Sequence, residues 1–141
     1  LIAPEAAIPE LEKLAQNLYI CAPHMAQWAA LAAFEEETLA ICEARREAFK
    51  ARRDFLLPAL RDLGFGIPTT PQGAFYLYAD ISKHSADSSA LCQRLLESEY
   101  LAITPGLDFG DYRRNEHVRF AYTASLDRLG QAVERLERSL R

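Results

Sequence analysis

The stretch that most constrains the fold is His117–Ser125, which reads HVRFAYTAS and alternates between two kinds of side chain. Val118, Phe120 and Tyr122 would share one face of a strand, which is bulky and apolar. The other face is small except for the guanidinium of Arg119, so the pattern predicts a half-buried strand. A rigidly held arginine beside small residues can grip a carboxylate through two parallel hydrogen bonds. An arbitrary strand arginine, however, is more often a solvated or structural ion pair.

Apolar residues at helical spacing predict two helices in the first 57 residues. The first begins at Pro4 and ends near Tyr19. The second is one long helix from about Met25 to Leu57, because good helix formers fill this stretch without glycine or proline. Such a helix would be roughly 50 Å long, more than a domain of this size covers, so its exposed length must meet something else.

Strand signals follow the long helix. Pro58 would kink or restart that helix, and Gly64 would cap its end. Phe65–Thr69 and Gly73–Ile81 read as two strands of a hairpin or sheet pair, with the leading glycine marking a point that needs room or unusual torsions. Leu101–Thr104 would add a short strand.

Two further helices complete the order of elements, one ending near Tyr100 and one capped by Ser125. The order is helix, long helix, strand pair, helix, strand, strand, helix. It predicts an α+β fold, a two-layer sandwich in which helices cover a small, mostly antiparallel sheet. With 141 residues, half of them hydrophobic, the chain is long enough for one domain with its own core.

Composition argues against several classes of partner. The net charge is −4 and the pI about 5.4, with arginines spread among glutamates, so we expect no nucleic acid. No apolar run approaches the roughly 20 residues of a membrane span, which predicts a soluble, cytoplasmic chain. No C-x-x-C pair points to a metal or a redox dithiol, so the three cysteines are expected to be reduced thiols: Cys21, Cys42 and Cys92.

Two polar segments offer no chemistry of their own. Lys83 and His84 read as a solvated loop pair, because the sequence places no third group to orient either of them. The Pro105–Gly110 loop has two glycines but lacks the lysine and helix start of a phosphate-binding loop. We therefore assign its glycines to turn geometry.

Three motifs in order, PQGAFYLYADIS, ITPGLDFG and HVRFAYTAS, resemble the C-terminal part of the class I/II aminotransferases. These are fold-type I enzymes that depend on pyridoxal 5'-phosphate. The resemblance implies that Arg119 binds the α-carboxylate of the substrate. It also implies that Phe75 and Tyr76 lie on the substrate side of the cleft, although simple packing explains them equally well, and that Pro105–Gly110 edges the cleft. NLYICAPHMAQWAALAAF resembles the segment entering the family's long interdomain helix, and Tyr19–Gln27 would approach the partner subunit of a homodimer.

The departure from the family concerns the lysine that binds the cofactor. None of Lys13, Lys50 and Lys83 has the family's Ser-Lys setting, so we predict no catalytic residue here. The chain also starts without methionine. We therefore expect residues 1–141 to be the small domain of an aminotransferase, with an N-terminal helix and the interdomain helix in residues 1–57. The large cofactor-binding domain would be absent, and the chain would be inactive alone.

The intact protein would transfer an amino group from an amino acid to a 2-oxo acid. Three alternatives stay open. A β-lyase or a decarboxylating synthase can share this fold, because fold does not fix the reaction. A transcription regulator can carry a non-catalytic aminotransferase-like domain. The chain could also be a freestanding interaction module in which Arg119 is merely structural.

Overall fold

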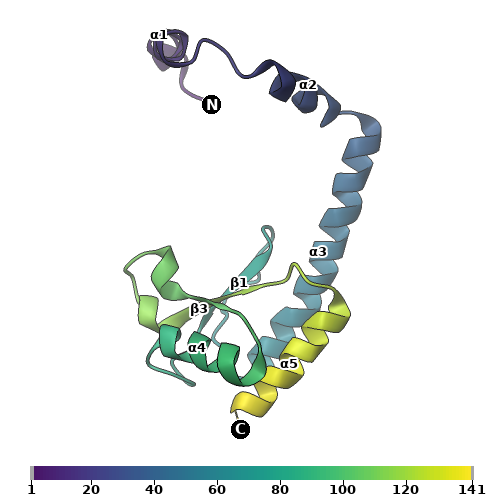
Figure 1. Cartoon of the computed structure of the whole chain (residues 1–141), viewed down its shortest axis with the longest axis vertical. Coiled ribbons are helices and arrows are strands. Elements are labelled where there is room, and N and C mark those ends of the chain that lie inside the picture. Colours follow the sequence, from purple (N-terminus) through teal and green to yellow (C-terminus); the bar gives the residue numbers. More distant parts are fainter. Residues whose placement is uncertain (1, 141) are drawn as a thin grey trace. The chain divides into compact units, whose positions relative to one another are not determined.

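The computed structural model describes residues 2–140 and divides the chain into two compact units, one ending at Ala44 and one starting at Arg45 (Figure 1). The first unit contains the short 3₁₀ helix η1 (Glu5–Ala7), α1 (Ile8–Leu18), α2 (His24–Ala32) and the start of α3. The predicted helix end near Tyr19 is confirmed, because the Tyr19 N–H donates to Ala15 O at 3.1 Å as the C-cap. No residue of η1, α1 or α2 is buried.

The prediction of one helix from Met25 to Leu57 was wrong at both ends. The chain turns after α2, where the Phe34 N–H donates to Leu31 O, and α3 spans Glu36–Asp62. A tight turn needs neither glycine nor proline, so helix propensity alone did not reveal it.

Pro58 lies inside α3 and does not restart the helix. Its ring is exposed, whereas Leu56, Leu57 and Leu60 around it are buried at 5% exposure or less. Burial of these leucines holds the helix against the core across the proline, at the expense of one backbone hydrogen bond.

A three-stranded antiparallel sheet forms the centre of the second unit. Its strands are β1 (Tyr76–Asp80), β2 (Thr104–Pro105) and β3 (His117–Ala121), in the spatial order β1-β3-β2. The predicted antiparallel sheet is confirmed, but its neighbours differ from the prediction. The expected strand at Phe65–Thr69 is a single bridge between Gly66 and Asp80, so β1 pairs with the distant β3 and not with a hairpin partner.

Two local observations explain why Phe65–Thr69 forms no strand and why β2 begins later than the predicted strand Leu101–Thr104. The guanidinium of Arg61 donates to Ile67 O at 2.7 and 2.9 Å, and Pro68 has no N–H to offer a neighbouring strand. The Leu101 N–H donates to Leu95 O at the end of the preceding helix, so β2 begins only at Thr104.

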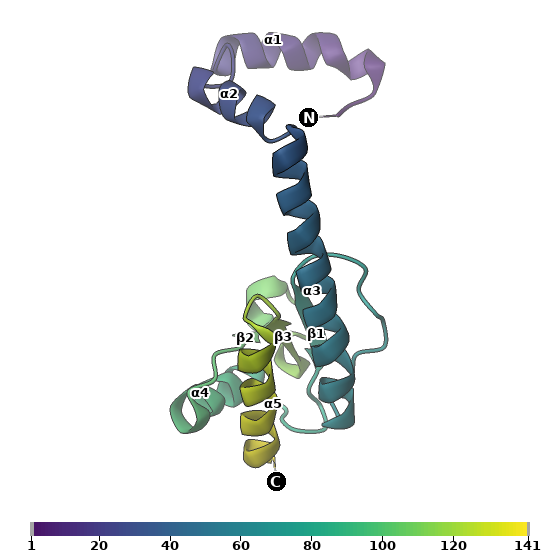
Figure 2. The same ribbon diagram turned by 90° about the vertical axis from the view of Figure 1, so that its right-hand side faces the viewer.

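The α-helices of the second unit lie on one face of the sheet (Figure 2). They are the second part of α3, α4 (Ser88–Glu99) and α5 (Leu126–Leu140). This arrangement confirms the two-layer α+β fold and the predicted apolar face of β3. The core consists of Leu56, Leu57, Leu60, Phe65, Ile67, Leu77, Ala79, Ile81, Leu91, Leu95, Val118, Phe120, Tyr122, Leu129 and Leu136.

Two glycine predictions had different outcomes. Gly64 has φ +94° after the end of α3, which confirms it as the residue that ends the helix. The unusual torsion before β1 belongs to Ala74, with φ +61°, and not to Gly73. The buried Tyr122 hydroxyl lies 3.2 Å from both Gly73 O and Ala74 O, so it donates to this corner of the chain and stabilises the strained alanine.

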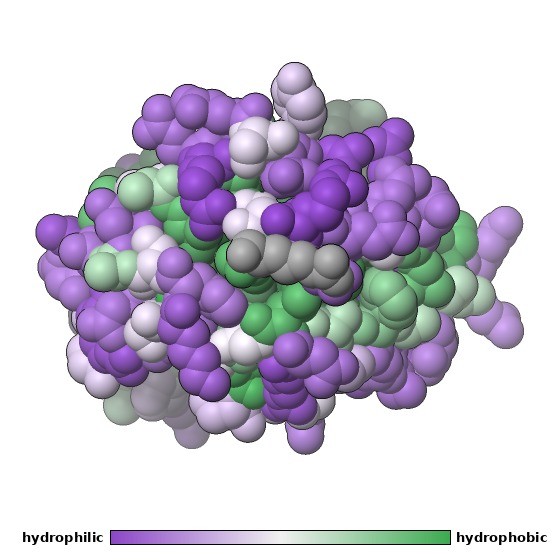
Figure 3. All heavy atoms as spheres, turned by 90° about the horizontal axis from the view of Figure 1, so that it is seen from below, coloured by the Kyte–Doolittle hydropathy of each residue, from purple (hydrophilic) through white to green (hydrophobic). Residues whose placement is uncertain are grey.

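The face seen in Figure 3 is mixed, with hydrophobic patches between hydrophilic side chains. Over residues 2–140, no helix combines the length and apolar character that a membrane crossing requires. In the same residues, no three His, Cys, Asp or Glu side chains are grouped so that they could hold a metal ion. The three cysteines are free thiols.

Candidate functional site

Arg119 lies in the middle of β3 on the face of the sheet opposite the core. The strand register sets it beside Tyr78 of β1 and Thr104 of β2. Its Nη2 donates to the Thr104 hydroxyl at 3.1 Å, and its Nε is buried without a hydrogen-bond partner. Within residues 2–140, this half-buried guanidinium has no carboxylate partner. It is therefore free to pair with an anion from outside the chain.

Two aromatic rings contact the guanidinium. Arg119 Cζ lies 5.8 Å from the ring centre of Tyr76 and 5.1 Å from that of Phe109, which ends the 3₁₀ helix η2 (Gly106–Phe109). Both distances are within the range of cation–π attraction. The rings cover part of the guanidinium and restrict the directions from which a ligand can reach it.

Of the two aromatic residues singled out in the sequence, only Tyr76 is in contact with Arg119. Phe75 packs edge-to-face on Tyr76, with ring centres 5.5 Å apart, and is 43% exposed. It reaches the site only through Tyr76, and its substrate-facing role stays a prediction.

An aromatic layer continues from Arg119 along the same face. Tyr78 stacks on His117 with ring centres 5.0 Å apart and meets Phe109 edge-on at 5.7 Å. Burial raises the pKa of the Tyr78 phenol, so it stays protonated as a hydrogen-bond donor.

Sequence reasoning did not single out three members of this surface: Tyr78, His117 and Thr104. The alternation of β1 and β3 already placed Tyr78 and His117 on the faces of Tyr76 and Arg119. The resemblance pointed to Phe109 only as part of the Pro105–Gly110 cleft edge. No signal in the sequence pointed to Thr104, because its position depends on the register of β2 against β3.

The prediction of a solvated Lys83–His84 pair was wrong for His84. Its ring lies 4.6 Å from that of Phe65, and its Nε2 is buried without a hydrogen-bond partner. Burial lowers the pKa of His84, and the nearby charge of Lys83 lowers it further. The backbone of Gly64, where a Cβ would lie 3.4 Å from this ring, leaves room for it. His84 therefore serves packing, while Lys83 is exposed.

The lysines of the chain do not fit the cofactor that the resemblance implies. Lys13 and Lys83 are exposed, and Lys50 is an exposed helix residue 3.6 Å from Asp54. None of them contacts Arg119 or its aromatic neighbours among the described residues. The Arg119 surface therefore offers no lysine among the described residues, and the absence of the cofactor's lysine stays a prediction.

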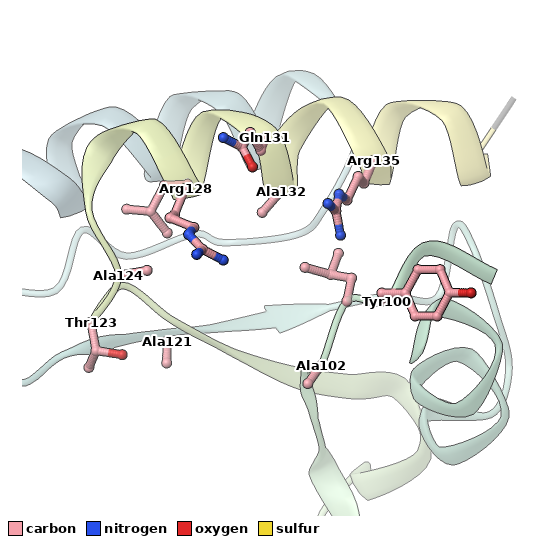
Figure 4. A pocket seen from close by; sticks show the side chains of 11 residues that line it. Tyr100, Ala102, Ala121, Thr123, Ala124, Arg128, Gln131, Ala132 and Arg135 are labelled. Carbon is pink, nitrogen blue, oxygen red and sulfur yellow. The ribbon is translucent and has the colours of Figure 1, made fainter. Parts of the chain in front are cut away.

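Two hollows lie in the second unit, among the described residues. The larger, of about 310 Å³, lies between α5 and the chain around Ala102 and Ala121, with Arg128 and Arg135 pointing toward it (Figure 4). Arg135 already donates to Glu99 O at 2.9 Å, so this arginine supports the fold. A smaller hollow of about 170 Å³ is bordered by Tyr76 and Tyr78 and therefore adjoins the Arg119 surface.

Curated proteins similar to the chain are aminotransferases. A valine–pyruvate aminotransferase of Mycobacterium tuberculosis is 33% identical over 136 residues, covering 96% of this chain and 35% of that protein. An aspartate/prephenate aminotransferase of Thermus thermophilus is 36% identical over 139 residues, covering 97% of this chain and 35% of that protein. The chain thus spans about a third of the length of these relatives.

Solved structures give the same result. An aminotransferase from Mycobacterium tuberculosis matches with a TM-score of 0.88 at 33% identity, over 98% of this chain and 36% of that one. The aromatic aminotransferase from Pyrococcus horikoshii matches with a TM-score of 0.82 at 28% identity, over 98% of this chain and 37% of that one.

The model of the family described as aminotransferase class I and II matches residues 1–136, which include all three motifs and Arg119. This match confirms the resemblance seen in the sequence. The chain belongs to the class I and II aminotransferase family.

Proposed function

We propose that the chain is the small, carboxylate-binding domain of a pyridoxal-phosphate-dependent aminotransferase that moves an amino group from an amino acid to a 2-oxo acid. Two features support the proposal: the relatives are aminotransferases, and the chain spans about a third of their length. The lysine and the other cofactor ligands would come from outside this chain, because none of its own lysines fits that role.

The observation that carries the proposal is the half-buried guanidinium of Arg119, which has no carboxylate partner among residues 2–140. An amino acid and the 2-oxo acid derived from it share the α-carboxylate. One arginine can therefore bind the substrate of both halves of a transamination. A bidentate pair between guanidinium and carboxylate fixes the position and the orientation of the substrate together.

Tyr76 is the second residue that we propose to face the substrate. Its ring contacts the Arg119 guanidinium and borders the neighbouring hollow, so a substrate bound to the arginine would pass close to it. Phe75 would lie beside Tyr76 at the edge of the substrate site, because its ring packs edge-on against the Tyr76 ring. Both residues offer apolar surface and leave the charge recognition to Arg119.

The intact protein would be a homodimer, with Tyr19–Gln27 near the partner subunit. In support, the first unit exposes a series of large apolar side chains that a surface in water rarely leaves uncovered. Sedimentation of the full-length protein as a monomer at micromolar concentration would contradict this part of the proposal. The exposed apolar side chains of the first unit include Leu14, Leu18, Tyr19, Ile20, Met25, Trp28, Leu31, Phe34, Leu39 and Ile41.

The proposal is tested with Arg119→Leu in the full-length protein. We expect kcat/KM for an amino acid to fall by roughly two orders of magnitude, because the substrate carboxylate loses its charge-assisted hydrogen bonds. The visible absorption of the bound cofactor should not change. Arg128→Leu is the matched control, since Arg128 is an exposed arginine of α5, and its activity should stay near that of the wild type.

Two results would contradict the proposal at different levels. An Arg119→Leu protein as active as the wild type would remove Arg119 from the site. A full-length protein that converts no amino acid to its 2-oxo acid would refute the aminotransferase activity itself.

A further inference from the structure

We propose that Thr104 and Phe109 are positioning residues, which hold the Arg119 guanidinium so that a carboxylate approaches it end-on through Nη1 and Nη2. The proposal rests on the carboxylate-binding role of Arg119 given above. It explains in addition why the Arg119 side chain has one orientation, and it identifies the edge of the guanidinium that the substrate carboxylate contacts.

The orientation follows from which edge of the guanidinium is open. A carboxylate can form two parallel hydrogen bonds with an arginine either side-on, through Nε and one Nη, or end-on, through both Nη atoms. In this structure Nε of Arg119 is buried and has no hydrogen-bond partner. The side-on edge is therefore closed, and the end-on edge remains.

The Thr104 hydroxyl fixes the rotation of the guanidinium. It accepts a hydrogen bond from Nη2 at 3.1 Å, and Thr104 lies directly opposite Arg119 in the pairing of β2 with β3. A threonine has few χ1 rotamers because it is β-branched, so its oxygen stays in place. Without this bond, the terminal part of the long arginine side chain would sample several orientations.

Phe109 restricts the guanidinium in a second direction. Its ring centre lies 5.1 Å from Arg119 Cζ, and Tyr76 lies at 5.8 Å. The two residues come from different segments, η2 and β1. The hydrogen bond to the Thr104 hydroxyl limits the rotation of the guanidinium, and the aromatic contacts limit its sideways displacement.

Thr104 and Phe109 belong to one short segment that is anchored to the start of β3. Its Gly106 packs so closely that an added Cβ would lie 2.4 Å from Arg114 O and 2.7 Å from His117 O. The hydroxyl of Ser88, a fully buried residue, donates to the same Arg114 O at 3.0 Å. The positioning groups are thus held by the same backbone that carries Arg119.

The experiment compares Thr104→Val with Thr104→Ser in the full-length protein. Valine keeps the shape but removes the acceptor, and serine restores the hydroxyl. Phe109→Leu tests the aromatic contact, and Thr70→Val on the exposed loop is the matched control. Two readouts are used: KM and kcat for amino acid and 2-oxo acid, and the calorimetric Kd of 3-phenylpropionate, a carboxylate that cannot react.

We expect Thr104→Val to raise both KM values and the Kd by the same factor, about three- to tenfold, which is the range for the loss of one ordinary hydrogen bond. The kcat should change less than about twofold. Thr104→Ser and Thr70→Val should bind like the wild type, and Phe109→Leu should resemble Thr104→Val.

Failure of this proposal can be told apart from failure of the proposed function. If Arg119→Leu no longer binds 3-phenylpropionate but Thr104→Val and Phe109→Leu bind it like the wild type, the arginine is the carboxylate site and the positioning role is wrong. If Thr104→Ser binds as weakly as Thr104→Val, the hydroxyl is not the cause and the positioning role is also wrong. If Arg119→Leu binds as well as the wild type, the carboxylate site itself is refuted.

Discussion

Replacing Gly106 by alanine tests the close packing that supports the Arg119 surface. An added Cβ would lie 2.4 Å from Arg114 O, 2.7 Å from His117 O and 2.9 Å from the Tyr78 hydroxyl. The shortest of these is about 1 Å inside an ordinary van der Waals contact of 3.4 Å. Two of the three atoms are backbone carbonyls at or next to β3, so they cannot move aside as a flexible side chain would.

The cost can be estimated from this geometry. Inserting one carbon into a packed region that must shift costs typically about 1–3 kcal/mol, and two backbone clashes place Gly106→Ala at the upper end, at about 2–3 kcal/mol. For a chain of 141 residues, this corresponds to a fall in Tm of roughly 6–12 °C. The shift also moves Thr104 and Phe109 away from Arg119, so carboxylate binding should weaken as well.

The assay is thermal unfolding of the 141-residue chain followed by circular dichroism, with Gly73→Ala as the matched control. An added Cβ at Gly73 meets nothing within 4 Å, so this variant should melt within about 2 °C of the wild type. Equal melting temperatures for the two alanine variants would refute the argument from close packing. The same comparison in the full-length protein, with 3-phenylpropionate as ligand, would show whether packing and carboxylate binding are linked.

Two further predictions concern buried polar groups. Burial lowers the pKa of His84 from 6.5, and the charge of Lys83 lowers it further, so the unfolded chain binds this proton more readily than the folded one. Urea titrations should show that the free energy of unfolding decreases as the pH falls below about 6.5. The His84→Gln variant should lose this pH dependence. If the free energy of unfolding of the variant depends on pH as that of the wild type does, another group is responsible. Tyr122→Phe removes the donor to Gly73 O and Ala74 O, which should lower the free energy of unfolding by about 1–2 kcal/mol in the same titrations, and no loss would mean that these contacts contribute nothing.

The fold class and the central strand could be read from the sequence, because burial of one face leaves an alternating pattern. Val118, Phe120 and Tyr122 are buried as that pattern required. The same reasoning misled at Phe65 and Ile67, which are equally buried but pack against the core without a strand partner. Periodicity reports which side chains are buried, and strand pairing depends on segments far away in the chain.

The helices show the same limit. Good helix formers fill the region from Met25 to Leu57, and nothing local marks the turn at Phe34. Pro58 was expected to kink or restart the helix on local grounds, but α3 continues through it because its neighbours are buried. Local propensity therefore predicted that the helices exist but misplaced both ends of the long one.

The candidate site was predictable where it depends on residue type and not where it depends on register. Arg119 and Tyr76 could be chosen because a strand alternation and a family resemblance pointed to them. Thr104 and Phe109 reach the guanidinium only through the pairing of β2 with β3 and the turn of η2. No sequence pattern encodes that pairing at a separation of 15 residues.

The sheet has the α-helices of its unit on one face and Arg119 with its aromatic neighbours on the other. A substitution at an exposed position of the second face removes little buried apolar area, so it leaves the stability of the fold nearly unchanged. Selection can then change the side chains that surround Arg119 and its bound carboxylate without changing the residues of the core. In a laboratory evolution experiment, a library restricted to Tyr76, Tyr78 and Phe109 would therefore keep most of its members folded.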